Sequence, residues 1–218
     1  MIVSTLYVGG CNFHCPFCYN TELVEHPQKL DTILKKDILL KLEKQKPFLD
    51  GICLSGGEPT IYEDLPELLK TFKDLQLKIK LDTNGSFPAM LELLIKENLV
   101  DYIAMDIKTT LCPSEYSKAI GVRHENIIKK IKKSIQLIMN AGIEYEFRTT
   151  VIPGFHDITT ILDIAREIKG AQRYVLQKFI QSEDMLDQYM KNVRPFSEDK
   201  MQEMQKKIEI YVQKSIIR

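Results

Sequence analysis

Short apolar runs alternate along the chain with longer segments whose apolar residues recur every three or four positions. Six runs are typical of buried strands: residues 2–8, 51–54, 77–81, 100–107, 145–152 and 174–179. The intervening segments show helical spacing, as Leu65, Leu68 and Phe72 do after the second run. Strands that alternate with helices predict one parallel sheet with right-handed crossovers.

The number of strand–helix units and the chain length together predict the type of sheet. A closed barrel of eight units typically needs about 250 residues, whereas this chain has six units in 218 residues. We therefore predict an α/β fold, an open partial (β/α)6 barrel with parallel strands. Because no linker or repeat breaks the chain, we expect a single domain over residues 1–218, with a core at about 2–180 and a C-terminal helical extension at about 181–218.

Composition and charge exclude several classes of partner. Thirty Lys and Arg balance thirty Asp and Glu, so no net field attracts nucleic acid or acidic lipid. The apolar runs are too short to span a membrane, and no secretion signal opens the chain. Five cysteines, three of them clustered, do not resemble a disulfide framework. These features predict a cytoplasmic protein in a reducing compartment, with no nucleic-acid or membrane partner.

Polar and glycine-rich motifs stand where four of the predicted strands end. They are residues 9–20, which we call the cysteine loop, and residues 55–59, 82–85 and 106–108. The carboxyl ends of parallel strands meet at one edge of a sheet, and active sites of such folds form there. We therefore expect these motifs to share one site. Arg148 is a further candidate, although it lies within the fifth strand.

The cysteine loop holds Cys11, Cys15 and Cys18 at a Cys-x3-Cys-x2-Cys spacing. Three thiolates on one short loop can converge on a soft metal centre, which can be an iron–sulfur cluster or zinc. A centre with only three protein ligands keeps one position open for chemistry. The alternative is a zinc knuckle, whose fourth ligand would be His14, Cys53 or Cys112.

The cysteine spacing, with Phe17 just before the third cysteine, resembles that of the radical S-adenosylmethionine (SAM) superfamily. The resemblance implies a [4Fe-4S] cluster on the three cysteines, with SAM bound to the open iron through its amino and carboxylate groups. Reductive cleavage of SAM would release a 5′-deoxyadenosyl radical. A flavodoxin- or ferredoxin-type protein would supply the electron, and Phe17 would pack near the adenine.

The same resemblance implies roles for the other motifs. Gly56 and Gly57, which let backbone approach a ligand closely, match a segment that binds the SAM amino group. A monovalent cation is implied near Asp82 and Asp106, with Thr83 as a further ligand. The cofactor-binding residues predicted in this way are Phe17, Gly56, Gly57, Glu58, Asp82, Thr83, Asn84, Asp106, Lys108 and Arg148.

Within the superfamily, the chain is most similar to the activating proteins of anaerobic ribonucleoside-triphosphate reductase, over roughly residues 2–196. The matching segments are residues 81–86, 100–108, 146–154 and 174–177. The resemblance implies that the protein removes a hydrogen atom from a glycine α-carbon of a partner glycyl radical enzyme. The lateral gap of an open barrel could admit a loop of that partner. One departure is Tyr19-Asn20 after the third cysteine, where close relatives often carry His-Asn.

Two other functions stay open. A radical SAM enzyme that acts on a small molecule, similar to carboxy-deazaguanine synthase, would need polar groups inside the barrel beyond those matched to SAM. A zinc- or cluster-bearing binding protein without catalysis would not need Asp82, Asp106, Lys108 and Arg148 together.

Overall fold

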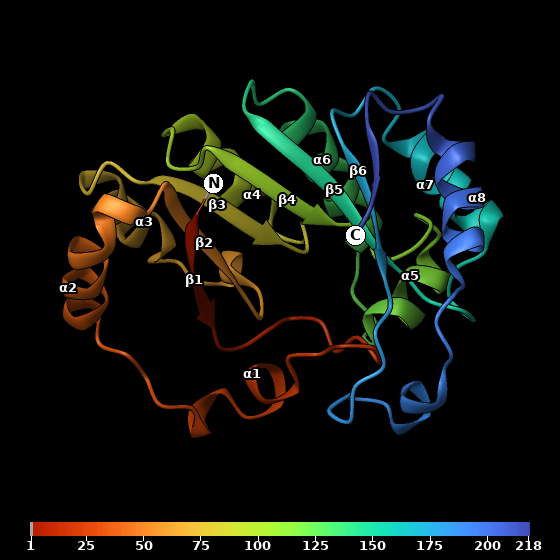
Figure 1. The fold of residues 1–218 in the computed structure, drawn as a ribbon, viewed down its shortest axis with the longest axis horizontal. Helices are drawn as coiled ribbons and strands as arrows, with labels where there is room; N and C mark the ends of the chain where they lie inside the picture. The colour runs from red at the N-terminus through yellow and green to blue at the C-terminus, as the bar shows by residue number, and fades with distance from the viewer. Residues whose placement is uncertain (1) are drawn as a thin grey trace.

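The computed structural model describes residues 2–218 as one parallel sheet flanked by helices (Figure 1). The strands are β1 (Val3–Val8), β2 (Gly51–Gly56), β3 (Lys78–Thr83), β4 (Tyr102–Asp106), β5 (Glu144–Val151), β6 (Tyr174–Lys178) and β7 (Ser215–Ile217). The α-helices are α1 (Thr21–Glu25), α2 (Lys35–Gln45), α3 (Leu65–Asp74), α4 (Pro88–Lys96), α5 (Pro113–Ile120), α6 (Ile127–Met139), α7 (Ile158–Glu167) and α8 (Glu198–Ile208). Over residues 2–218, no helix is long and apolar enough to cross a membrane.

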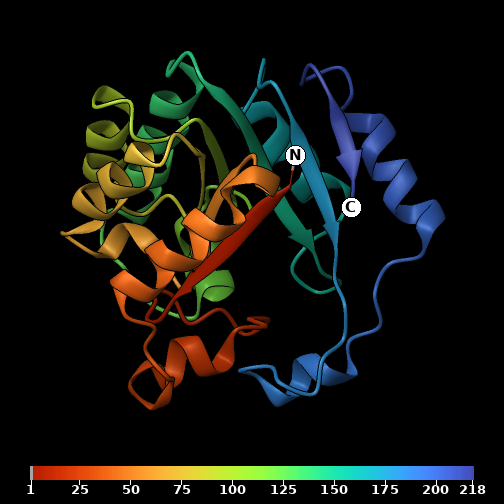
Figure 2. The same ribbon diagram turned by 60° about the vertical axis from the view of Figure 1, so that its left-hand side comes forward.

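The seven strands stand in chain order, and every neighbouring pair is parallel. Strands β1 and β7 form the two edges of the sheet and do not pair, so the curved sheet does not close (Figure 2). The predicted α/β fold, an open barrel of parallel strands, is confirmed. In such a fold all the strand ends that carry the predicted motifs lie on one side of the molecule.

Side chains of each strand alternate between the helix-covered face and the interior of the barrel. On β3, Ile79 and Leu81 are fully buried in the hydrophobic core, whereas Lys80 and Asp82 face the opposite side. On β5, Phe147 lies in the same core and Arg148 points to the interior. The barrel interior is therefore lined with polar side chains, and the apolar core lies between the sheet and the outer helices.

Amphipathic helices cover the outer face of the sheet. Helix α3 buries Leu69 and Phe72, and helix α6 buries Ile131 and Ile138. Residues of this kind recur at three- and four-residue intervals, which keeps them on one side of the helix. Their burial anchors the strands and so fixes the relative positions of the loops at the strand ends.

Strand β7 and helices α1 and α5 were not predicted from the sequence. Strand β7 pairs with β6 within residues 181–218, where only a helical extension was expected. A strand of three residues is too short to give a periodic signal. Helix α5 occupies residues 113–120, for which no element was predicted. Proline is favourable at the first position of a helix, so Pro113 starts α5 rather than preventing it.

Candidate functional site

The carboxyl ends of the strands surround a cavity of about 350 Å³. All the residues predicted for the site line this cavity. They are Cys11, Cys15, Phe17, Cys18, Gly56, Gly57, Glu58, Asp82, Thr83, Asn84, Asp106, Lys108 and Arg148. The fold thus brings together motifs that are up to 137 residues apart in the sequence, counted from Cys11 to Arg148 (148 − 11).

The cysteine loop folds over one side of the cavity. Cys15 is buried, whereas Cys11 and Cys18 are half-buried. The Cys18 backbone N–H donates to the Cys15 carbonyl at 2.9 Å, and the Phe13 N–H donates to Cys11 Sγ at 3.4 Å. Burial raises the pKa of the Cys15 thiol to about 12. A metal centre would therefore have to displace a proton from Cys15 when it binds.

The arrangement of the three sulfurs bears on the kind of centre they fit. Among residues 2–218, no three His, Cys, Asp or Glu side chains are close enough together to hold a single metal ion. A zinc site needs four ligands on one ion. A cubane cluster instead takes each cysteine on a different iron, so its sulfurs lie farther apart. The three cysteines line one cavity, as a cluster with three protein ligands requires.

The loop after β2 holds the start of the cysteine loop by backbone contacts. The Glu58 N–H donates to the Gly10 carbonyl at 2.9 Å, and the Gly57 N–H donates to the Val8 carbonyl at 2.8 Å. A Cβ at Gly57 would lie 1.8 Å from the Gly10 oxygen. Only glycine allows the two loops to approach this closely. On the cavity side, the Asn20 amide donates to the Gly56 carbonyl at 3.2 Å.

Helix α5 supports the cysteine loop from another direction. The His14 N–H donates to the carbonyl of Ile120, the last residue of α5, at 2.8 Å. Gly121, which ends the helix in the left-handed conformation, lies so close that a Cβ there would be 1.9 Å from the His14 oxygen. The helix that the sequence did not predict therefore fixes the backbone between Cys11 and Cys15.

Glu58 connects the loops after β2 and β3 from a buried position. Its carboxylate accepts hydrogen bonds from Thr83 Oγ1 at 2.7 Å, from the Asn84 N–H at 2.6 Å and from the Thr60 N–H at 3.1 Å. Burial raises the pKa of Glu58, and these donors act in the opposite direction. Thr83 thus points toward Glu58 rather than toward Asp82, which lies on the other face of β3.

A further hydrogen-bond network joins the loop after β3 to the cysteine loop. The Asn84 amide donates to Asn12 Oδ1 at 3.0 Å, and the Asn12 amide donates to Ser86 Oγ at 2.9 Å. Sequence reasoning singled out Asn84 but not Asn12 or Ser86. Asn12 directly follows Cys11, and Ser86 directly follows Gly85. Their position next to these motif residues was the signal that could have identified them.

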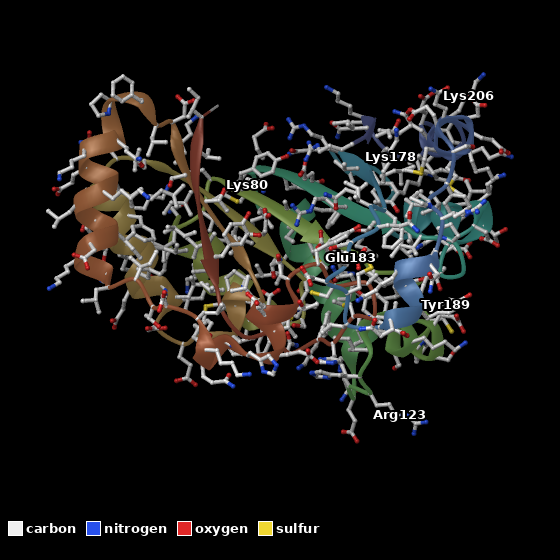
Figure 3. All side chains as sticks on the ribbon, turned by 60° about the horizontal axis from the view of Figure 1, so that its bottom comes forward. Lys80, Arg123, Lys178, Glu183, Tyr189 and Lys206 are labelled. Atoms are coloured by element: carbon white, nitrogen blue, oxygen red, sulfur yellow. The ribbon has the colours of Figure 1, made fainter. Side chains whose placement is uncertain are left out.

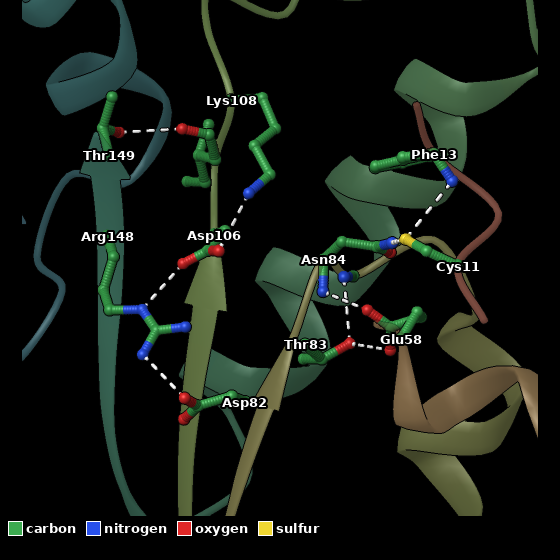
Figure 4. Close-up of polar contacts among 12 residues, drawn as sticks. Cys11, Phe13, Glu58, Asp82, Thr83, Asn84, Asp106, Lys108, Arg148 and Thr149 are labelled. Atoms are coloured by element: carbon green, nitrogen blue, oxygen red, sulfur yellow. Dashed lines mark hydrogen bonds and ion pairs between the residues drawn. The ribbon is translucent and has the colours of Figure 1, made fainter. Parts of the chain in front are cut away.

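The opposite wall of the cavity carries charged side chains in contact with one another (Figure 4). Arg148 Nε lies 2.7 Å from Asp106 Oδ1, and Arg148 Nη1 lies 3.1 Å from Asp82 Oδ2. Lys108 Nζ lies 2.9 Å from Asp106 Oδ2. Burial alone would raise the pKa of Asp106, but Arg148 and Lys108 hold that pKa well below its usual range. All three groups are therefore charged at neutral pH.

His156 holds the Lys108 backbone, a role that the sequence did not decide. Its Nδ1 accepts a hydrogen bond from the Ile152 N–H at 3.0 Å, so Nε2 carries the proton and donates to the Lys108 carbonyl at 2.9 Å. Burial lowers the pKa of His156 to about 4, which keeps the ring neutral. His156 does not line the cavity and acts only through its neighbours.

The segment after β6, residues 179–196, lies against the cysteine loop (Figures 1 and 2). The Ile180 N–H donates to the Tyr19 hydroxyl at 2.8 Å, and the Asp187 N–H donates to the Pro16 carbonyl at 3.0 Å. Figure 3 shows that Tyr189 of this segment projects from the surface. Tyr19 therefore connects the cysteine loop to this segment.

The other two cysteines, Cys53 and Cys112, lie outside the cavity. Cys53 is buried on β2, with its Sγ 3.6 Å from Lys80 Nζ. Cys112 is exposed at the start of α5. Neither one lines the cavity, which agrees with the view that three cysteines alone form the centre.

Comparison with known sequences identifies a family and several relatives. A family model described as "Radical SAM superfamily" matches residues 5–174. A protein of Methanocaldococcus jannaschii named "Putative glycyl-radical enzyme activating enzyme MJ1227" is 32% identical over 219 aligned positions, which cover 99% of this chain and 88% of that protein. A Methanococcus maripaludis protein named "Probable GTP 3',8-cyclase" is 28% identical over 87% of this chain and 62% of its own length.

Solved structures show the same fold at low sequence identity. The structure of Streptococcus suis SuiB bound to S-adenosylmethionine matches 99% of this chain with a TM-score of 0.74 and 15% identity. SuiB crystallised with its precursor peptide SuiA matches with a TM-score of 0.72 and 16% identity. This chain spans about half the length of each of these structures, 50% and 48%.

Proposed function

This chain belongs to the radical SAM superfamily, and we propose that it uses SAM to generate a glycyl radical on a partner enzyme. In this proposal Cys11, Cys15 and Cys18 hold a [4Fe-4S] cluster, whose chemistry is to supply the electron that breaks a C–S bond of SAM. The partner is a glycyl radical enzyme, and anaerobic ribonucleoside-triphosphate reductase is the one we favour. A flavodoxin- or ferredoxin-type protein supplies electrons in a reducing, oxygen-poor cytoplasm.

One observation carries the proposal: the cysteines and the charged strand-end residues line the same cavity. SAM combines an ammonium, a carboxylate and a sulfonium. Backbone groups of Gly56 and Gly57 can contact the ammonium, because these glycines carry no side chain over the cavity. Lys108 can form a charge-assisted hydrogen bond with the carboxylate. Phe17, whose ring packs edge-on against Phe155 at 5.4 Å, offers an apolar surface to the adenine.

The charge of the cavity favours an activating enzyme over an enzyme that acts on a nucleoside triphosphate. Its lining holds three acidic side chains, Glu58, Asp82 and Asp106, against the two basic ones of Lys108 and Arg148. Both basic groups already contact carboxylates. The lining carries more acidic than basic side chains, which disfavours a triphosphate with its high negative charge.

The neutral polar side chains of the cavity suit a peptide. Ser55, Thr150 and Gln177 line it from β2, β5 and β6. Hydroxyl and amide groups can both donate to and accept from the backbone of a peptide. The unpaired edges of β1 and β7 leave a side of the barrel through which a loop of a partner could enter. The similarity to a protein named as a glycyl-radical enzyme activating enzyme supports the same substrate class.

The experiment that tests this function combines the protein with its partner. The protein is reconstituted with iron and sulfide without oxygen, reduced, and mixed with SAM and the anaerobic ribonucleotide reductase of the same organism. We expect a glycyl-radical doublet in the EPR spectrum. A Cys15→Ala variant, treated in the same way, should give no doublet, because it lacks one ligand of the cluster.

The possible outcomes of this experiment distinguish the proposed function from its alternatives. Cleavage of SAM without a doublet would contradict this choice of partner and favour another glycyl radical enzyme or a small-molecule substrate. Cleavage that begins only when GTP is added would favour the activity named for the GTP 3',8-cyclase relatives. An equal doublet from the Cys15→Ala variant would contradict the assignment of the cluster ligands.

A further inference from the structure

The inner faces of three neighbouring strands carry one continuous chain of ion pairs. Asp82 is on β3, Asp106 is on β4 and Arg148 is on β5. The guanidinium of Arg148 bridges the two carboxylates, at 2.7 Å from Asp106 and 3.1 Å from Asp82 (Figure 4). A planar guanidinium with five N–H donors is well suited to contact two carboxylates at once.

Every oxygen of these two carboxylates has a protein partner. For Asp106, Oδ1 accepts from Arg148 Nε and Oδ2 accepts from Lys108 Nζ at 2.9 Å. For Asp82, Oδ1 pairs with Lys80 Nζ, while Oδ2 accepts from Ser55 Oγ at 3.1 Å and pairs with Arg148. The oxygens that could bind a small cation are therefore already engaged.

The charges of this group oppose a further cation. Two carboxylates contact three basic side chains, those of Lys80, Lys108 and Arg148, which gives a formal net charge of +1 (3 − 2). These side chains are mostly buried, with exposed fractions between 11% and 27%. Buried charges are screened little by salt, so a fourth positive charge would be repelled. Thr83, predicted as a further cation ligand, donates instead to Glu58 at 2.7 Å.

The reach of Arg148 depends on a small residue of β4. Strand β4 lies between β3 and β5, so the Arg148 side chain must cross it to reach Asp82. The register places Asp106 beside Arg148, and Ala104 between Asp82 and Glu146. Alternation along the strand puts Ala104 on the same face as Asp106. The methyl group of Ala104 leaves the path open, and a longer side chain there would occupy it.

We propose that Arg148 is the built-in counter-ion of the Asp82–Asp106 pair, in the place where the family resemblance predicted a monovalent cation. Arg148 is then a positioning residue. It holds both carboxylates in place, uses two of its N–H donors for them, and keeps the others for a ligand. The inference rests on the proposed binding of SAM but not on the glycyl-radical step. It means that SAM binding by this protein requires neither Na⁺ nor K⁺.

The first test measures SAM binding to the reconstituted protein by anaerobic equilibrium dialysis. Binding is compared in choline chloride, NaCl and KCl at one ionic strength. We expect the dissociation constants of the natural protein to agree within twofold. An affinity that rises fivefold or more in NaCl or KCl would overturn the proposal. If no salt supports SAM binding, the proposed function fails instead, and the second test still decides the cation question.

The second test detects the cation directly and needs no SAM. The relaxation of ²³Na⁺ is measured with the natural protein and with Arg148→Gln and Ala104→Leu variants. We expect no saturable, K⁺-displaceable signal from the natural protein. Such a signal should appear in both variants, because each one removes the contact of Arg148 with Asp82 Oδ2. Arg173→Gln is the matched control, since Arg173 pairs with Glu144 away from the cavity.

The second test can also contradict the proposal. Saturable Na⁺ binding by the natural protein would show that the carboxylate pair keeps a cation site beside Arg148. If Ala104→Leu does not fold, Arg148→Gln alone carries the comparison. The proposal would also be contradicted if a folded Arg148→Gln variant did not bind Na⁺, because the guanidinium of Arg148 would then not stand in the place of a cation.

Discussion

His156 shapes the site from a position outside the cavity, through the backbone of Lys108. Its ring accepts from the Ile152 N–H and donates to the Lys108 carbonyl, so both nitrogens are used. The sequence contains His156 two residues after Pro153-Gly154, but its partner Lys108 stands 48 residues earlier in the chain. Such a contact has no local pattern, and sequence reasoning could not predict it.

The neutral state of His156 predicts how stability depends on pH. Burial lowers its pKa from 6.5 to about 4, so between these values the unfolded chain binds a proton that the folded chain does not. Stability therefore falls as the pH falls through this window, by about 2 kcal/mol between pH 7 and pH 5 for this group. A His156→Gln variant should lose that part of the dependence. Urea unfolding at both pH values measures it, and an unchanged dependence in the variant would contradict the assignment.

Lys108 offers a second prediction at the scale of a residue. A Lys108→Gln variant should weaken SAM binding by roughly 10- to 100-fold, as expected for the loss of a charge-assisted hydrogen bond. Anaerobic equilibrium dialysis of reconstituted protein measures the change. Lys118→Gln is the control, because Lys118 is exposed on α5 and pairs only with Glu115. Equal SAM affinity in both variants would show that Lys108 does not contact the cofactor.

At the scale of the element, the sequence predicted the strands and the motifs at their ends. It did not predict the elements that contact the cysteine loop, such as helix α5. Buried strands such as β2 and β4 give clear apolar runs, so the predicted strands and the parallel sheet follow from pattern alone. Helix α5, which begins at Pro113, was not predicted. Its contact with His14 depends on tertiary packing, which no local pattern records.

The contact between α5 and the cysteine loop can be tested with two glycines of the same conformation. Gly121 has φ +68 and Gly142 has φ +70, but only at Gly121 would a Cβ meet another residue, the His14 carbonyl. Alanine at either position should cost roughly 1 kcal/mol of stability through backbone strain, and Gly121→Ala should cost more because its Cβ would lie 1.9 Å from the His14 oxygen. We expect Gly121→Ala alone to lower the iron content after reconstitution, by half or more. Equal iron contents in the two variants would contradict the supporting role of α5.

At the scale of the whole molecule, the open barrel places the cavity of the candidate site at the carboxyl ends of its strands. The three cysteines, the charged wall and the neutral groups of β5 and β6 converge on one cavity. The sequence predicted that convergence, because parallel strands end at the same edge. It could not predict that Arg148 would bridge Asp82 and Asp106, since that contact joins three separate strands.

The central claim is that the radical made from SAM takes a hydrogen atom from a glycine of a partner protein. The most direct measurement uses anaerobic ribonucleotide reductase in which glycine carries deuterium on its α-carbon, and mass spectrometry of the 5′-deoxyadenosine formed. The account predicts one deuterium in 5′-deoxyadenosine for each glycyl radical produced. Unlabelled 5′-deoxyadenosine, formed while a glycyl radical accumulates on the labelled partner, would contradict it.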